Sequence, residues 1–548
     1  MQRIAASVLV LLASLALAAP AGAQAPRPAT PELIDRAVER GTISKAEGLR
    51  LLARALLRPN TIPGQYVSWT PWDGTFPLRR VQEEAPKLPD SAAKREIVAM
   101  LRAPQHPEDP SFNCYTESSG PLPQAIESEH FFIEYAADEL FGGGLTIEDY
   151  ADSLDTSWNR EVEEFGYAAP PILEGTPYGK YNVRVYPLQP GLYGYVGTEG
   201  TYGGVVGDNP ATPWPEDDAA ATCMVLNTDY ETGFEQLTVG TPRQRLDATT
   251  AHEFLHSIQF GYGALDNGPN EPDLSFSEGH ATWMEDEVFD DADDNHNYLY
   301  PTFEDSMGEH DEGSVYSYWL TWRGITQRFG TGTAGAHEDI VQRFWEISGR
   351  EEYTTLDAMD IALAPTGLGL AEAFHDYAIA ARFLKPCGGG YAMPHCFEEA
   401  DAFADVAGGR PEPHGAIEEL GGTFGTPNEP AEIEDNLALN WIDLPAATEP
   451  MAVTLAPRIS DSHLRMSVIC DTGSGLRVVA APNVVRGGGT VTARFDPAGC
   501  QSRPSAVITN ETRRAPNPDS STFTRYVLGV GAAPPEQPPA APPADPIA

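Results

Sequence analysis

The sequence predicts an α+β domain followed by an all-β, sandwich-like domain. Between residues 126 and 415, segments with helical apolar stripes are interspersed with short apolar runs typical of strands. Between residues 416 and 531, six short β-like runs follow one another, separated by turn residues. The chain has 548 residues, too many for one ordinary domain, and its hydrophobic content of 41% is enough for packed cores.

The chain begins with a segment typical of a signal peptide. A short positive start, Met1-Gln2-Arg3, precedes an apolar stretch over residues 4–18 and the small-residue cleavage motif Ala23-Gln24-Ala25. A membrane anchor is the alternative, but the apolar run is shorter than the roughly 20 residues that a membrane-spanning helix needs. We therefore expect residues 1–25 to be a signal peptide of a secreted or periplasmic protein with no membrane span.

Cysteine content and charge limit the classes of partner. Six cysteines fit an oxidising compartment. Proximity favours pairing of Cys387 with Cys396 and of Cys470 with Cys500, which leaves Cys114 for Cys223, although other pairings stay open. The formal net charge of -45 argues against nucleic acid or an anionic membrane surface as a general partner.

Residues 26–125 form a leader region ahead of the main domain. Apolar spacing predicts a helical hairpin over residues 31–57, broken at Gly41-Thr42. We expect irregular, proline-rich sequence from Pro71 to Pro110. The region fits either a prosegment or a small structural domain, and the sequence leaves both open.

The elements of the two main domains follow from local patterns. In residues 126–415 we expect strands at 130–135, 181–185 and 223–227, loops at 190–215, and helices at 146–165, 247–261, 274–288, 315–329, 338–348 and 368–384. In residues 416–531 we expect strands at 452–455, 464–469, 476–480, 490–495, 506–509 and 523–530. Residues 532–548 form a proline- and alanine-rich tail that is expected to be disordered.

The motif His252-Glu253-Phe254-Leu255-His256 carries the strongest chemical signal. Histidines four residues apart lie on one face of a helix, so that both rings can reach one metal ion. Glu253 would then stand beside the open coordination position, where it can accept a proton from water. The pattern predicts a zinc site; the alternative is a pair of helix histidines with structural partners only.

A catalytic zinc site needs one more protein ligand. A ligand six residues after the second histidine, as in metzincins, is excluded because Gln259 and Tyr262 occupy the glycine and ligand positions of that pattern. The next candidate is Glu278, on the predicted helix 274–288, where a return helix can bring its carboxylate to the metal. A surface glutamate is the alternative reading of Glu278.

These two helices resemble the active-site helices of a known clan. The motif helix followed by Glu278-Gly279-His280-Ala281-Thr282-Trp283 resembles the gluzincin clan of zinc peptidases, and the layout after residue 30 resembles a family of predicted exported bacterial metalloproteases. The resemblance implies an α+β zincin-like (gluzincin) metalloprotease domain with His252, His256 and Glu278 as zinc ligands and Glu253 as general base. One position departs from the clan, because Thr282 stands where many members have an acidic residue that orients a histidine; Glu285 is the substitute one turn further.

Two outer features complete the expected site. Tyrosine or histidine donors commonly help to hold the oxyanion of a tetrahedral intermediate, and Tyr316 aligns best with the tyrosine of similar peptidases. Tyr318, His280 and His310 are the weaker alternatives. The acidic run 286–295 has the oxygen ligands that suit Ca²⁺ but lacks the spacing of an EF-hand, and a solvated acidic turn is the favoured interpretation.

The expected function is that of a secreted zinc-dependent endopeptidase. It would hydrolyse peptide bonds in a protein or peptide substrate by metal-activated water, with Glu253 as general base and Tyr316 as a further catalytic residue. The strand at 223–227 is a candidate for binding the substrate backbone by β-addition. The alternative is a secreted or surface binding protein that uses its β-sandwich, with the zincin-like domain as an inactive scaffold. The oligomeric state is not indicated by the sequence.

Overall fold

The computed structural model describes residues 28–101 and 122–534, apart from gaps at 137–140, 173–178, 199–204, 217, 233, 235–236, 238, 266–273, 300–314, 330–337, 351–352, 406–410 and 515–521. The expected signal peptide, Cys114, His310 and all but the first residues of the expected tail lie outside the described residues. Within the described part, no helix has the length and apolar character needed to cross a membrane.

The described part of the N-terminal region contains α1 (Thr30–Glu39), α2 (Lys45–Leu57), the short 3-10 helices η1 (Pro59–Thr61) and η2 (Gly64–Tyr66), α3 (Thr75–Glu84) and α4 (Ala92–Leu101). The hairpin α1–α2 agrees with the prediction, and Ser44 caps α2 by accepting the Glu47 N–H. The expectation of irregular sequence beyond Pro71 was wrong for α3 and α4. Pro77 lies in the first turn of α3, where backbone N–H groups have no partner within the helix, so a proline is tolerated there.

A five-stranded sheet forms the base of the central region. Its order is β1 (Gln124–Glu127), β2 (Phe131–Tyr135), β3 (Tyr181–Val185), β7 (Thr222–Leu226) and β4 (Gly194–Thr198). Strands β2, β3 and β7 are parallel, whereas β1 and β4 run antiparallel to their neighbours. The last strand, β4, lies at an edge of the sheet.

The expectation of loops over residues 190–215 was wrong, because β4 and β5 (Val205–Gly207, paired with β6, Ala219–Ala220) lie there. Two of the five residues of β4 are glycines, which have low β-propensity, so the local sequence did not predict a strand. One of them, Gly194, is required by close approach: a Cβ at this position would lie 2.9 Å from the Val225 carbonyl oxygen and 3.1 Å from Glu253 Oε1.

Helices α5 (Ile147–Trp158, continued by a π-helical turn, Asn159–Glu164) and α6 (Pro242–Gly261) pack on this sheet, and α7 (Leu274–Val288) packs against α6. Helix α6 packs against α5, α7, β4 and β7 and is buried along almost its whole length. It begins five residues before the predicted start, because Thr241 and Gln244 form a capping box and Pro242 occupies the first turn. Helix α7 has the predicted bounds.

The remaining helical elements extend the same core toward the C-terminal region. They are η6 (Asp294–Tyr298), η7 (Val315–Tyr318), α8 (Trp319–Thr326), η8 (Gln327–Phe329), α9 (Glu338–Arg350), α10 (Thr355–Leu363), η9 (Ala364–Thr366), α11 (Leu370–Ala381) and α12 (Ala400–Asp405). Helix α10 was not predicted, although Thr354 caps it by accepting the Asp357 N–H.

Two sheets make up the C-terminal region. One contains β10 (Ala431–Glu434), β18 (Phe523–Ala532), β12 (Met451–Pro457), β16 (Val491–Phe495) and β9 (Thr423–Phe424); the other contains β14 (Leu476–Ala480), β13 (His463–Asp471), β17 (Ser505–Asn510), β11 (Ala438–Asp443), β8 (Gly415–Ala416) and β15 (Val485–Arg486). All six predicted β runs are strands, and apolar residues of both sheets form one cluster, including Leu455 and Val468. An α+β region followed by C-terminal β-sheets is therefore confirmed.

The cysteine predictions are tested in part. Disulfides join Cys387 to Cys396 and Cys470 to Cys500, as expected. The expected pair of Cys114 and Cys223 includes a residue outside the described part of the chain.

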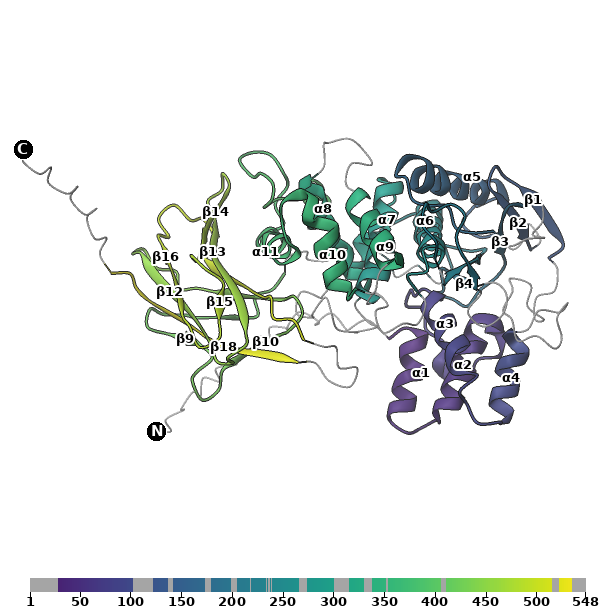
Figure 1. The fold of residues 1–548 in the computed structure, drawn as a ribbon, viewed down its shortest axis with the longest axis horizontal. Helices are drawn as coiled ribbons and strands as arrows, with labels where there is room; N and C mark the ends of the chain where they lie inside the picture. The colour runs from purple at the N-terminus through teal and green to yellow at the C-terminus, as the bar shows by residue number, and fades with distance from the viewer. Residues whose placement is uncertain are drawn as a thin grey trace, which may run out of the picture.

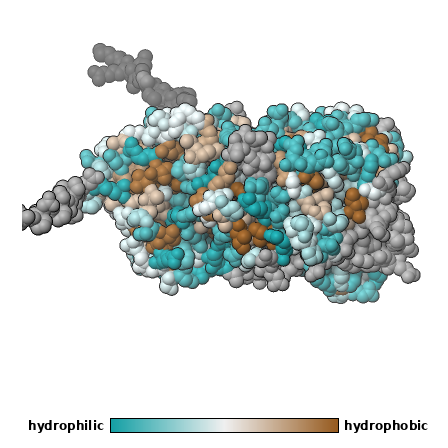
Figure 2. Space-filling view, turned by 45° about the horizontal axis from the view of Figure 1, so that its top comes forward, coloured by the Kyte–Doolittle hydropathy of each residue, from teal (hydrophilic) through white to brown (hydrophobic). Residues whose placement is uncertain are grey.

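Figure 1 shows the N-terminal helices lying below the central sheet, near β4, and the C-terminal sheets at the opposite end of the molecule. Helix α11 links the central helices to the C-terminal sheets: His375 lies 2.7 Å from Thr509 Oγ1, and the Trp441 indole donates to the Ala378 carbonyl at 2.8 Å. The face in Figure 2 is covered mainly by hydrophilic residues, with hydrophobic residues in separate small groups.

Candidate metal centre

Helix α6 places both motif histidines in the buried core. His252 and His256 lie one turn apart, with ring centroids 4.8 Å apart and ring planes at 84°. Their Nε2 atoms are 3.1 Å apart. Such a short approach between two basic nitrogens requires either a shared proton or a cation between them.

Helix α7 adds a carboxylate to the two rings. Glu278 Oε2 lies 3.0 Å from His252 Nε2 and 3.4 Å from His256 Nε2. Burial alone would raise the pKa of Glu278, but His256 and His252 outweigh this effect and lower the pKa to about 2. Glu278 is therefore an anion that faces both ring nitrogens. The structure brings together the three residues that the sequence analysis selected as ligands.

The other nitrogen of each ring has an acceptor that orients it. His256 Nδ1 lies 2.8 Å from Gln259 Oε1, and the amide of Gln259 in turn donates to the Ser277 carbonyl at 3.1 Å. His252 Nδ1 lies 2.8 Å from Glu285 Oε1. Since an acceptor meets Nδ1 in both rings, Nδ1 carries the proton and Nε2 presents its lone pair to the centre.

The position that departs from the clan pattern has a simple role in the helix. The Thr282 hydroxyl donates to the Glu278 carbonyl at 2.9 Å, one turn back along α7. Glu285, one turn beyond Thr282, supplies the carboxylate that orients His252 instead. Gln259, which excluded the metzincin pattern in the sequence, orients His256 here.

A fourth residue of the centre, Asp73, comes from the N-terminal region and was not predicted. Potential ligand atoms of Asp73, His252, His256 and Glu278 all lie within 4.8 Å of one another, and all four residues are buried. This group could hold a metal ion. Asp73 stands immediately before α3, where its Oδ1 accepts the Thr75 N–H at 2.8 Å. Among prolines and far from the motif, it carries no sequence signal for metal binding.

Glu253 faces the same centre from α6. Its Oε2 accepts a hydrogen bond from the Thr75 hydroxyl at 2.9 Å, and its side chain is almost fully buried. Burial, reinforced by the negative charge of Asp73, raises the pKa of Glu253 well above its usual range. A carboxylate with a raised pKa, next to a potential metal site, has the properties of a general base.

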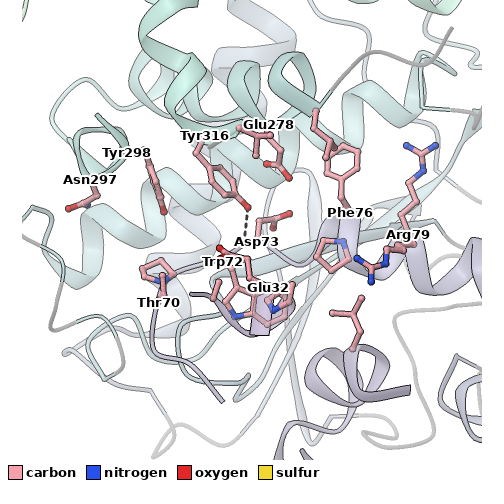
Figure 3. Close-up of a pocket in the computed structure, with 18 of the residues that line it drawn as sticks. Glu32, Thr70, Trp72, Asp73, Phe76, Arg79, Glu278, Asn297, Tyr298 and Tyr316 are labelled. Carbon is pink, nitrogen blue, oxygen red and sulfur yellow. Dashed lines mark hydrogen bonds between the residues drawn. The ribbon is translucent and has the colours of Figure 1, made fainter. Parts of the chain in front are cut away.

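A cavity of about 620 Å³ opens beside the centre, between the N-terminal region and the central region. Figure 3 shows Tyr316 on its wall, next to Asp73 and Glu278. The Tyr316 hydroxyl accepts the Asp73 N–H at 3.2 Å, and its ring centroid is 6.1 Å from that of His252. Burial, followed by the charge of Glu278, raises the pKa of Tyr316 above its usual range, so that the hydroxyl keeps its proton.

The weaker alternatives to Tyr316 lie elsewhere. The β-carbon of Tyr318 packs toward Gly279, within the core under α7. His280 is buried among aromatic rings, with its ring centroid 4.4 Å from that of Trp322. Burial lowers the pKa of His280 well below the usual range. His310 lies outside the described residues.

The acidic run 286–295 is split between two environments. Asp286 and Asp290 approach Glu399 to form a second group that could hold a cation, but Arg323 already lies 3.4 Å from Asp286 and 3.5 Å from Glu399. Asp294 instead accepts the Tyr193 hydroxyl at 3.0 Å. The run as a whole does not converge on one point, and a calcium role for it stays a prediction.

Comparison of the chain with protein-family models and with curated proteins gives no match.

Proposed function

We propose that this protein is an exported, zinc-dependent endopeptidase whose central region is a gluzincin-type, zincin-like domain. The observation that carries the proposal is the triangle of His252 Nε2, His256 Nε2 and Glu278 Oε2, with edges of 3.0, 3.1 and 3.4 Å. Tetrahedral zinc with bonds of about 2.0–2.1 Å separates neighbouring ligand atoms by about 3.3–3.4 Å. The donor set therefore fits zinc in both chemistry and spacing.

The residues around this triangle support hydrolysis. Zinc bound there would lower the pKa of a water molecule and polarise a substrate carbonyl. Glu253, next to the triangle, is placed to accept the proton and pass it to the leaving amine. Tyr316 keeps its proton and lies on the cavity wall beside Glu278, where its hydroxyl can donate to a developing oxyanion.

The edge strand β4 is the favoured site for the substrate backbone. The strand at 223–227, which was the initial candidate, corresponds to β7, and β7 pairs on both sides with β3 and β4. Its backbone groups are therefore already used. Strand β4 lies beside Glu253 at the edge of the sheet, with β7 as its neighbouring strand, so an extended peptide could add to its other side once residues 72–75 leave it.

The proposal is tested by hydrolysis of casein after removal of the leader region, combined with zinc analysis. Glu253→Gln should retain zinc and lose about 10²–10⁴-fold in rate, because the general base is removed while the ligands stay. Glu278→Ala should lose both zinc and activity. Glu163→Ala, an exposed carboxylate beyond α5, is the matched control and should change neither.

One result would reject the endopeptidase, and a second would reject Glu278 as a zinc ligand. Equal inactivity of wild type and Glu253→Gln, with no zinc in either, would leave a binding protein that uses its C-terminal sheets. Full zinc stoichiometry in Glu278→Ala would remove Glu278 from the set of ligands.

A further inference from the structure

We propose that the N-terminal region is an inhibitory segment that closes the metal centre, with Asp73 as a displaceable fourth ligand. The inference rests on the proposed function, and it assigns to one residue of the leader region the coordination position that a catalytic site keeps open for water or substrate.

Asp73 provides the first argument. Its carboxylate belongs to the same group of ligand atoms, all within 4.8 Å, as His252, His256 and Glu278. The position of Asp73 is fixed by one hydrogen bond of its backbone and one of its side chain. The Asp73 N–H donates to the Tyr316 hydroxyl, and Asp73 Oδ1 accepts the Thr75 N–H. With two histidines and Glu278 as the other ligands, the Asp73 carboxylate would complete a set of four.

The backbone around Asp73 provides the second argument. Trp72 N–H donates to the Gly191 carbonyl at 2.9 Å, and Gly74 N–H donates to the Gly194 carbonyl at 3.0 Å. Trp72 thereby forms a parallel bridge with Leu192, two residues before the edge strand β4 (Gly194–Thr198) begins. The segment thus occupies part of the sheet edge that an extended substrate would need.

Thr75 blocks the general base in addition. Its hydroxyl donates to Glu253 Oε2 at 2.9 Å and accepts the Val196 N–H of β4 at 2.8 Å. One residue therefore links the base to the edge strand. Within residues 72–75, the backbone of Trp72 and Gly74 covers the sheet edge, Asp73 lies at the metal position, and Thr75 covers Glu253.

The helices of the N-terminal region hold this segment in place. Phe76 packs edge-on against His256, with ring centroids 5.5 Å apart. Buried leucines of α2 share one hydrophobic cluster with Leu192, Tyr195 and Val225 of the central region. Residues of α1, α2 and α3 line one side of the cavity beside the centre (Figure 3). Removal of these helices would therefore open the cavity to solvent.

A permanently closed structural metal site is the competing explanation, since structural zinc sites commonly have four protein ligands. The two explanations differ in what happens when Asp73 is weakened. If Asp73 is a displaceable ligand, its substitution leaves a site with three protein ligands that can bind an external ligand. If Asp73 is a structural ligand, its substitution causes loss of the metal.

The test uses the full chain loaded with Co²⁺, titrated with acetohydroxamate and followed by visible absorption. Asp73→Asn removes the anionic ligand but keeps an oxygen for the Thr75 N–H. Gly74→Ala keeps Asp73 and displaces the segment, because the added Cβ would lie 2.8 Å from Leu56 and 2.9 Å from Tyr195. The controls are Asp90→Asn, an exposed carboxylate of the same region, and Gly64→Ala, whose Cβ meets no atom within 4 Å.

We expect Asp73→Asn and Gly74→Ala to bind acetohydroxamate about 100-fold more tightly than wild type, because a tethered carboxylate competes at an effective concentration in the range of about 1 mM or above. The two control variants should behave like wild type. The same five proteins are then incubated with casein, where the two opened variants should be the active ones.

Equal hydroxamate affinity in all five proteins would overturn the inhibitory segment, and so would loss of Co²⁺ from Asp73→Asn without any response to hydroxamate. If the two opened variants bind hydroxamate but none of the proteins digests casein, the closed centre stands and the endopeptidase is rejected. If no protein takes up Co²⁺, both proposals fall.

Discussion

The N-terminal helices and the C-terminal sheets both pack against the central α+β region, but they meet it in different ways. The N-terminal region places Asp73 and Thr75 among the residues of the metal centre. The C-terminal sheets meet the central region at α11, through His375, Trp441 and the ion pair of Arg382 with Asp443 at 2.9 Å. None of these contacts involves a residue of the centre. One neighbour is positioned to control the site, whereas the other is positioned to support the fold.

Core truncations in the two flanking regions have the largest expected effect, and they test whether only the N-terminal region controls the metal centre. Leu56 in α2 and Leu455 in β12 are both fully buried, and Leu→Ala at each should lower the free energy of unfolding by about 2–5 kcal/mol. We expect Leu56→Ala to increase hydrogen exchange at α2 and β4 and to raise hydroxamate affinity. Leu455→Ala should increase exchange in the C-terminal sheets only. A rise in hydroxamate affinity in Leu455→Ala would show that the C-terminal region also controls the centre.

The orientation of His252 gives an effect of intermediate size. Glu285→Ala removes the acceptor at His252 Nδ1 and should weaken Zn²⁺ affinity about 10–100-fold, as loss of such partners does in other metal sites. Thr282→Val is the matched change on the same helix, and it should leave Zn²⁺ affinity unaltered because the Thr282 hydroxyl donates to the Glu278 carbonyl of its own helix. Competition with a fluorescent zinc chelator measures both. Equal affinities in the two variants would contradict the role of Glu285.

The smallest effect concerns acid stability of the C-terminal contact. Burial, followed by the charge of Arg465, lowers the pKa of His375 to about 3. An unfolded chain binds this proton at about pH 6.5, so the contribution of His375 to stability is present above that pH and is lost as the pH falls from about 6.5 to 3. Residues 28–101 contain no histidine, so no histidine in this part of the N-terminal region makes the stability depend on pH in this way.

His375→Gln should therefore flatten the fall of the melting temperature between pH 6.5 and the lower limit of folding, by comparison with wild type. The measurement is a series of calorimetric scans, with His463→Gln, at a less buried position of β13, as the control. An unchanged pH dependence in His375→Gln would show that its proton uptake does not limit acid stability.

Local patterns were sufficient for much of the fold. Helix α7 was predicted with its bounds, and the β runs between 452 and 530 were all strands, since period and turn residues depend only on neighbouring residues. Strand β4 was missed because its glycines lack β-propensity, and Gly194 is required there by Val225 and Glu253, which lie elsewhere in the chain. Helices α3 and α4 were missed because prolines near them were weighed more heavily than their apolar spacing.

The candidate site divides in the same way. The sequence by itself determined His252, Glu253 and His256, because their spacing on one helix is a local property, and it pointed to Glu278 on the next predicted helix. The departure at Thr282 also pointed to Glu285 as the residue that orients a histidine. Only the tertiary structure decided that Gln259 orients His256 and that Asp73 and Thr75 reach the centre. A carboxylate becomes a potential ligand through its position in space. Asp73 gains that position from the backbone hydrogen bonds of Trp72 and Gly74 with Gly191 and Gly194 and from the packing of α2 and α3, which no pattern near residue 73 contains.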